Sequence, residues 1–326
     1  NTAIGYESLM GSSTAANNTG LNNTAVGYQV LVANTSGNRN SSFGNLSLSS
    51  NTSGYNNTAI GSESLFANTT GFNNTATGLD ALHFNNGDNN IAGGTASLYN
   101  NTTGAQNSAF GLSSLEGNTI GVHNIAIGVN TLPVNTIGNR NVAVGNQSLY
   151  NNISGNNNSA FGYKALYGNT QSNNSAFGYA ALFGNTTGVN NSAFGYRALQ
   201  ANTFGANNTA VGSDALKTNS TGSQNTAVGV QALRENTTGI RNTAVGFQSM
   251  VVNTIGTENS AFGYLSLYTN TTGSNNSAFG RSALQSNTIG ANNVAVGNSS
   301  LLNNTIGNNN TAIGLNSMYY NTTGVS

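Results

Sequence analysis

Large apolar, small and polar residues follow one another along this chain in a fixed order that repeats about every 17 residues. Each copy reads Asn, Thr or Ser, Ala, a large apolar residue and Gly, with Leu four positions later and an Asn-Thr pair after that. Short β-branched or aromatic runs bracketed by Asn and Gly are typical of strands and turns. A helix is disfavoured, because every copy carries several residues of low helix propensity. The pattern therefore predicts an all-β fold, a parallel β-solenoid (β-roll) in which two short strands and two turns form each coil.

We number the positions of a copy from the Asn of its N-[TS]-A-x-G block. Of the 18 spacings between the starts of successive copies, fifteen are 17 residues long and two are 16. The first is 22 residues long, because it contains an insertion near residues 11–16. We predict one continuous array of about 19 coils over residues 1–326. The coils start at Asn1, Asn23, Asn40, Asn57, Asn74, Asn90, Asn107, Asn124, Asn141, Asn158, Asn174, Asn191, Asn208, Asn225, Asn242, Asn259, Asn276, Asn293 and Asn310.

The predicted strand around position 4 has no polar face. Position 4 is large and apolar, whereas positions 3 and 5 are Ala and Gly, and neighbours on a strand face opposite sides. We expect a strand buried on both faces, with the bulky side in the coil's own core and the small side against a second chain. In the alternative, Ala and Gly serve only tight packing inside the coil. The core is also expected to hold a Leu spine at position 9, made of Leu31, Leu48, Leu65, Leu82, Leu98, Leu115, Leu132, Leu149, Leu166, Leu182, Leu199, Leu216, Leu233, Leu267, Leu284 and Leu301.

Asn recurs at positions 1 and 12, which predicts two ladders in which each side chain bonds to its copies one coil above and below. Gly at position 15 is expected to supply a positive φ. The ladder at position 1 is predicted to contain Asn23, Asn40, Asn57, Asn74, Asn107, Asn124, Asn141, Asn158, Asn191, Asn208, Asn225, Asn242, Asn259, Asn276, Asn293 and Asn310.

Glycosylation sequons are abundant. At position 17, where Arg, His, Gln and Glu also occur, we expect solvent exposure and easier glycan attachment. At position 12 the Asn persists where Ile at position 14 removes the sequon, so structure requires it. The alternative is that Asn ladders beside Thr create sequons by accident. Candidate sites are Asn34, Asn51, Asn68, Asn101, Asn152, Asn185, Asn219, Asn236, Asn270 and Asn321 at position 12, and Asn56, Asn73, Asn190 and Asn275 at position 17.

Charge is scarce: only 5% of residues are charged, and eight acids balance eight bases. We therefore expect neither nucleic-acid binding nor membrane insertion. Opposite charges one coil apart predict surface pairs between Arg197 and Asp214 and between Arg241 and Glu258.

The chain has no Cys, and it begins without Met or a signal peptide, so we expect a processed chain or a piece of a longer fibre.

Reactive groups are equally scarce. His83 and His123 fall at different positions of the repeat, and we expect no carboxylate pair beside either. No phosphate-binding loop and no Ca²⁺-binding Asp repeat occurs. The sequence predicts no catalytic, metal-binding or cofactor-binding residues and no enzyme.

The N-[TS]-A-[VI]-G blocks resemble the head repeats of YadA-like trimeric autotransporter adhesins. The residues that carry this resemblance are Asn141-Val-Ala-Val-Gly145 and Asn124-Ile-Ala-Ile-Gly128, and Asn225–Leu233 is similar to the N-T-A-V-G-Y-Q-A-L repeats of tail-fibre-like proteins. The resemblance implies a left-handed parallel β-roll, a trimer, and display outside a cell or on a virion. The period of this chain departs from that family, because it is longer than the period of those heads.

These patterns favour a structural extracellular fibre or filament segment, an adhesin or tail-fibre-like spacer, at a cell or virion surface. Its expected partners are copies of itself, side by side or end to end, and cell-surface glycans.

Two alternative functions remain open. A Thr column at position 13, from Thr35 to Thr322, is similar to an ice-binding array. A Tyr column at position 6, with Tyr163, Tyr179 and Tyr196 in successive coils, would suit a carbohydrate-binding receptor fibre, although simple ladder packing also explains it.

Overall fold

The computed structural model describes residues 1–12 and 18–324, and these residues contain 19 strands and no helix. They form a parallel β-solenoid in which bonded partners in most successive coils are 17 residues apart in sequence, which confirms the predicted parallel β-solenoid. None of the described segments is a helix of the length and apolarity that a membrane span requires. The predicted insertion near residues 11–16 falls mostly on residues 13–17, outside the described residues. The chain divides into two compact units, Asn1–Asn158 and Ser159–Ser326.

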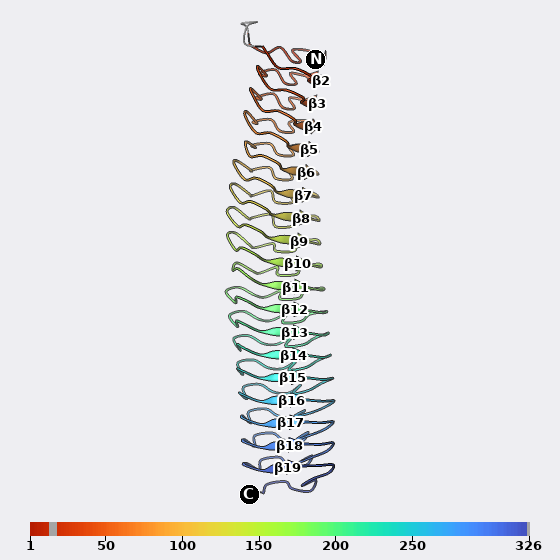
Figure 1. Cartoon of the computed structure of the whole chain (residues 1–326), viewed down its shortest axis with the longest axis vertical. Coiled ribbons are helices and arrows are strands. Elements are labelled where there is room, and N and C mark those ends of the chain that lie inside the picture. Colours follow the sequence, from red (N-terminus) through yellow and green to blue (C-terminus); the bar gives the residue numbers. More distant parts are fainter. Residues whose placement is uncertain (13–17, 325–326) are drawn as a thin grey trace. The chain divides into compact units, whose positions relative to one another are not determined.

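In the first unit, every coil contributes one short strand, and successive strands pair in parallel and in register (Figure 1). Ala59 of one strand, for example, lies opposite Ala76 of the next. Register is kept because each coil repeats the same order of large and small residues. The strands are β1 (Thr2–Ile4), β2 (Thr24–Tyr28), β3 (Ser41–Asn45), β4 (Thr58–Ile60), β5 (Thr75–Thr77), β6 (Ile91–Gly93), β7 (Ser108–Phe110), β8 (Ile125–Ile127) and β9 (Val142–Val144).

The second unit repeats this arrangement, again with parallel strands in register (Figure 1). Ala193 lies opposite Ala210, and Phe194 lies opposite Val211. The strands are β10 (Ser159–Phe161), β11 (Ser175–Phe177), β12 (Ser192–Phe194), β13 (Thr209–Val211), β14 (Thr226–Val228), β15 (Thr243–Val245), β16 (Ser260–Phe262), β17 (Ser277–Phe279), β18 (Val294–Val296) and β19 (Thr311–Ile313).

The prediction of two strands per coil is wrong, because the segment from position 7 to position 11 is not extended. Positions 7 and 9 have positive φ; in one coil Asp214 has φ 56° and Leu216 has φ 49°, whereas strands require negative φ. Successive coils still bond to each other here. The N–H of Leu216 donates to the carbonyl of Ala232 at 3.0 Å, and the N–H of Asp214 donates to the carbonyl of Tyr196 at 2.9 Å. The second side of the coil is therefore a hydrogen-bonded stack without strand geometry.

The core consists of small and medium side chains. Ala at position 3 and Leu at position 9 are fully buried, as Ala210 and Leu216 are in one coil, and every Leu of the predicted spine is 0% exposed. The bulky side chains at position 4 point outward instead, which corrects the prediction that they fill the core. The strand is buried on its Ala face only. The alternative, that the small residues serve tight packing inside the coil, is what the structure shows.

Two columns of buried Asn line the coil ends. At position 12 the side chains bond to one another: Asn219 Nδ2 donates to Asn202 Oδ1 at 2.8 Å and to the carbonyl of Gly222, also at 2.8 Å. At position 1 the side chains bond mainly to backbone, and in several coils they also bond to one another, as Asn310 Nδ2 does by donating to Asn293 Oδ1 at 3.0 Å. Asn208 Oδ1 accepts the N–H of Asn225 at 3.0 Å, and Asn225 Nδ2 donates to the Gly239 carbonyl at 2.8 Å. Each ladder thus satisfies polar backbone that would otherwise be buried without a partner.

The role predicted for Gly at position 15 is also wrong. Positive φ occurs at Gly of position 5, such as Gly212 at 134°, and at Asn of position 17, such as Asn207 at 58°. At position 15 the reason for Gly is space: a Cβ on Gly222 would lie 2.3 Å from Asn219 Oδ1 and 2.4 Å from the Gly239 carbonyl oxygen. The Asn ladder therefore excludes any larger residue there.

Candidate functional site: an outward apolar face

Position 4 forms a column of half-exposed apolar side chains along the outer side of the strands. In the second unit Phe194 is 40% exposed and Val211 is 38% exposed. Phe161, Phe177 and Phe194 stack in successive coils, with ring centroids 4.7 and 4.8 Å apart. In the first unit Thr77 and Gly93 interrupt the column. Rings stacked on one another still leave their outer edges uncovered.

Position 6 forms a second exposed column, two residues further along each coil. Tyr163, Tyr179 and Tyr196 stack with centroids 5.4 and 5.3 Å apart, and all three side chains are more than 40% exposed. Position 6 is Val230 and Phe247 in two later coils, and both are also exposed. We call positions 4 and 6 together the outward face.

The outward face of the second unit alone is large. Aromatic side chains present about 150–250 Å² each, so half-exposed rings and aliphatic groups over these coils offer on the order of 1,000 Å² of apolar surface. Monomeric soluble proteins rarely leave contiguous apolar patches above a few hundred Å² uncovered. A patch of this size is typical of a protein interface, which needs about 800 Å² per partner.

The Thr column at position 13 is occupied by bonds within the chain. Thr203 Oγ1 donates to the Ser220 carbonyl at 3.0 Å, and Thr237 Oγ1 donates to the Thr254 carbonyl at 3.0 Å. These side chains are only partly exposed. Their hydroxyl protons are directed along the stack rather than toward solvent.

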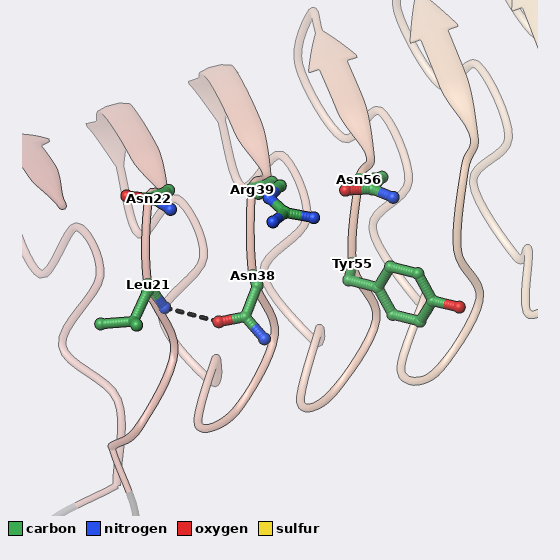
Figure 2. Close-up of a pocket in the computed structure, with 6 residues that line it drawn as sticks. All are labelled: Leu21, Asn22, Asn38, Arg39, Tyr55 and Asn56. Carbon is green, nitrogen blue, oxygen red and sulfur yellow. Dashed lines mark hydrogen bonds between the residues drawn. The ribbon is translucent and has the colours of Figure 1, made fainter.

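The candidate glycosylation sites fall into two groups. Nine of the ten at position 12, all except the part-buried Asn321, are at most 5% exposed, and their Nδ2 atoms serve the ladder. Attachment of a sugar would replace one of the two Nδ2 hydrogens, so the Asn would lose one of the two hydrogen bonds that it donates in the ladder. At position 17, by contrast, Asn56, Asn73, Asn190 and Asn275 are exposed. Figure 2 shows Asn56 at the edge of a hollow that positions 16 and 17 of three coils line, where the N–H of Leu21 donates to Asn38 Oδ1 at 2.8 Å.

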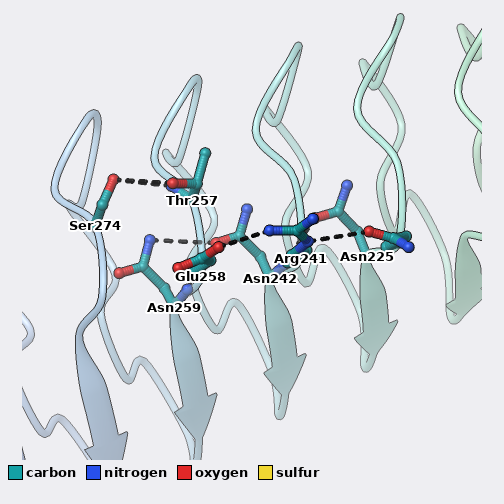
Figure 3. Close-up of polar contacts among 8 residues, drawn as sticks. Asn225, Arg241, Asn242, Thr257, Glu258, Asn259 and Ser274 are labelled. Carbon is teal, nitrogen blue, oxygen red and sulfur yellow. Dashed lines mark hydrogen bonds and ion pairs between the residues drawn. The ribbon is translucent and has the colours of Figure 1, made fainter.

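The charged pairs predicted between coils are confirmed. Arg197 Nε lies 3.0 Å from Asp214 Oδ1, and Arg241 Nη1 lies 2.9 Å from Glu258 Oε1, the latter on an exposed column (Figure 3). Other polar side chains at position 7 of successive coils also bond to each other. Glu7 Oε2 accepts from Gln29 Nε2 at 2.7 Å, and this bond lowers the pKa of Glu7 below its usual value.

One group of side chains was missed by the sequence analysis. Glu63, Asp80 and His83 converge, with potential ligand atoms within 4.8 Å of one another, contrary to the expectation that no carboxylate pair lies beside a histidine. The two acids share position 7 in successive coils, and His83 follows Asp80 by three residues. The sequence places the two acids in one column, but it does not show that the His83 ring at position 10 reaches them. His123, by contrast, is exposed at position 17.

No protein-family model and no curated protein matches this chain. The resemblance to YadA-like heads therefore stays a prediction, and the geometry of the outward face carries the functional argument.

Proposed function

We propose that this chain is a structural segment of an extracellular fibre, without catalytic activity, which assembles with copies of itself through the outward face. The observation that supports this most directly is the stack of half-exposed side chains from Phe161 to Phe194 and onward through Val211. Burial of such a face stabilises an assembly by about 25 cal/mol for each Å² removed from water. A spacer, filament or adhesin at a cell or virion surface fits this design.

Copies of the same chain are the partner that the face suits best. In the second unit its apolar groups at position 4 repeat once per coil, and only a surface with the same repeat matches them along that length. The chain has few charges and no net charge, so steering toward a charged partner is weak. A trimer, in which three outward faces meet around one axis, is the assembly that the resemblance to trimeric heads favours.

Sedimentation velocity of the purified chain over a range of concentrations tests the proposal. The informative variant places Lys on the outward face at three coils, as Phe194→Lys, Val228→Lys and Phe262→Lys. The matched control places Lys at exposed position 14 as Thr221→Lys, Thr238→Lys and Thr272→Lys. We expect the parent and the control to sediment as one closed oligomer. The face variant should already be dissociated at protein concentrations at least about tenfold above those at which the parent dissociates, because each buried charge costs several kcal/mol.

Two results would contradict the proposal. One is a monomeric parent chain at every concentration. The other is an oligomer that survives in the face variant as well as in the control. Circular dichroism of each variant separates loss of assembly from loss of the fold.

A carbohydrate-binding receptor fibre is a second candidate, favoured by the exposed Tyr163–Tyr179–Tyr196 stack. Stacked aromatic rings are suitable platforms for sugar rings. Binding on a glycan array that disappears in Tyr179→Ala, while the parent is monomeric, would favour this function over self-assembly. The ice-binding alternative receives no such support, because the hydroxyls at position 13 already donate within the chain.

A further inference from the structure

Three side chains of the first unit form a compact polar cluster beside the solenoid core. Glu63 and Asp80 carry their carboxylates in successive coils, and both side chains are partly exposed. His83 Nδ1 lies 3.4 Å from Asp80 Oδ1 and 3.7 Å from Glu63 Oε2. Elsewhere position 7 pairs opposite or neutral groups, such as Arg197 with Asp214. The stacking of two like charges at this one place calls for a positive partner between them.

The imidazole of His83 is buried and fixed in orientation. Its side chain is 8% exposed, and its ring stacks between Phe66 and Tyr99, with centroids 5.0 and 4.9 Å away. Phe84 packs edge-on at 4.4 Å. In this aromatic slot, Nδ1 is the one buried side-chain polar atom of the described residues that lacks a hydrogen-bond partner. An unsatisfied buried polar atom costs about 1–3 kcal/mol, so its orientation toward two carboxylates indicates a missing partner.

The distances distinguish between two possible partners. If a proton on Nδ1 bridged to a carboxylate, the N···O distance would be about 2.7–3.2 Å, shorter than either observed distance. A tetrahedral ion about 2.0–2.2 Å from each ligand separates the ligand atoms by about 3.3–3.6 Å. The separations of 3.4 and 3.7 Å are close to the edges of such a tetrahedron. One nitrogen and two carboxylate oxygens suit Zn²⁺ and its first-row neighbours, whereas Ca²⁺ and Mg²⁺ take oxygen ligands.

We propose that Glu63, Asp80 and His83 bind one divalent transition-metal ion, of which Zn²⁺ is the representative, with water completing the coordination. The ion neutralises the two stacked carboxylates and joins two successive coils, so it acts as a local staple of the solenoid. The site is independent of self-assembly, because its ligands lie at positions 7 and 10 and not on the outward face.

Isothermal titration calorimetry of the full chain with ZnCl2, after treatment with EDTA and dialysis, tests the site. We expect one Zn²⁺ to bind per chain, and affinity to fall at least tenfold in His83→Phe. Phe suits this position because the neighbouring coils carry Phe66 and Tyr99 there. His123→Asn is the matched control, since it removes the other, exposed histidine and restores the residue usual at position 17.

A second variant keeps the test informative if His83→Phe fails to fold. Asp80→Asn changes a partly exposed side chain and should also reduce Zn²⁺ affinity at least tenfold. With Co²⁺ in place of Zn²⁺, the visible absorption typical of a tetrahedral ion should appear in the parent and vanish in both variants. The proposal is overturned if the parent binds no Zn²⁺, or if His83→Phe and Asp80→Asn bind Zn²⁺ as tightly as the parent, whatever the result for His123→Asn.

Discussion

At the scale of single residues, the solenoid depends on where a Cβ or a side-chain amide can fit. Gly at position 5 combines a positive φ with close approach to the next coil; on Gly178, with φ 138°, a Cβ would lie 2.4 Å from the Gly195 carbonyl oxygen. Asn at position 12 links three coils, because Asn219 donates to Asn202 and accepts from Asn236. Position 5 is Gly in every copy and position 12 is Asn in every copy after the first, whereas exposed position 14 accepts Thr, Ile, Ser and Phe.

Gly178→Ala should destabilise the chain by at least about 2 kcal/mol, since an L-residue at this φ is strained by about 1–3 kcal/mol and its Cβ also overlaps backbone. Urea unfolding followed by circular dichroism measures the effect. Gly184→Ala in the same coil is the control; its φ is not positive, and the next coil carries Ala201 at the same position. Equal stability of the two variants would show that position 5 does not require Gly.

Asn219→Ala should cost about 2–3 kcal/mol, because it removes buried hydrogen bonds and leaves polar groups of two neighbouring coils without a partner. Thr221→Ala, two residues away and exposed, should change stability by less than about 0.5 kcal/mol. The same unfolding measurement compares them. A loss for Asn219→Ala no larger than the loss for Thr221→Ala would mean that the ladder adds nothing to stability.

At the scale of elements, each coil has a thin core and an apolar outside. Leu at position 9 and Ala at position 3 are fully buried, whereas the β-branched or aromatic residue at position 4 is half exposed. The strand thus presents its larger side chain to the surroundings. Stability of the single chain and affinity between chains are therefore expected to depend on different columns.

Leu216→Ala should lower the free energy of unfolding by about 2–5 kcal/mol, the range for Leu removed from a packed core. Val211→Ala, in the same coil but 38% exposed, should cost less than about 1 kcal/mol in the monomer, because little transfer free energy is lost. Unfolding should be measured at protein concentrations low enough to keep the chain dissociated. Similar losses for both variants would contradict the separation of core and outward face.

At the scale of the whole molecule, coils of one unit contact mainly their neighbours, so stability should grow coil by coil. Strand pairs such as β12 with β13 and β13 with β14 have the same register. Interchangeable coils of this kind can be lost or gained without a change of fold, provided that a whole repeat is involved.

Deletion of residues 191–207, one full repeat, should leave a folded chain, because position 17 then continues directly into position 1. Deletion of only residues 199–207 should disrupt the unit, since the remaining half coil cannot close. Far-UV circular dichroism and urea unfolding report both outcomes. If the half-repeat deletion folds as well as the full-repeat deletion, register between coils is not what holds the stack together.

The sequence by itself determined the repeat, the buried Leu and Asn columns and the pairing of Arg197 with Asp214, because each follows from a strict period in a stack of identical coils. Only the tertiary structure decided which side of the strand faces inward. Ala and the bulky residue at position 4 are both apolar, so the pattern contains no polar side to mark the solvent, and the structure buries the small residue, Ala210, together with Leu216.

The tertiary structure also decided the backbone of positions 7 and 9 and the meeting of His83 with Glu63 and Asp80. Leu has no intrinsic preference for a positive φ, and it adopts one here because the next coil bonds to its N–H and the core receives its side chain. The cluster around His83 combines two columns and two coils, and only the path of the turn brings those atoms within reach of one ion.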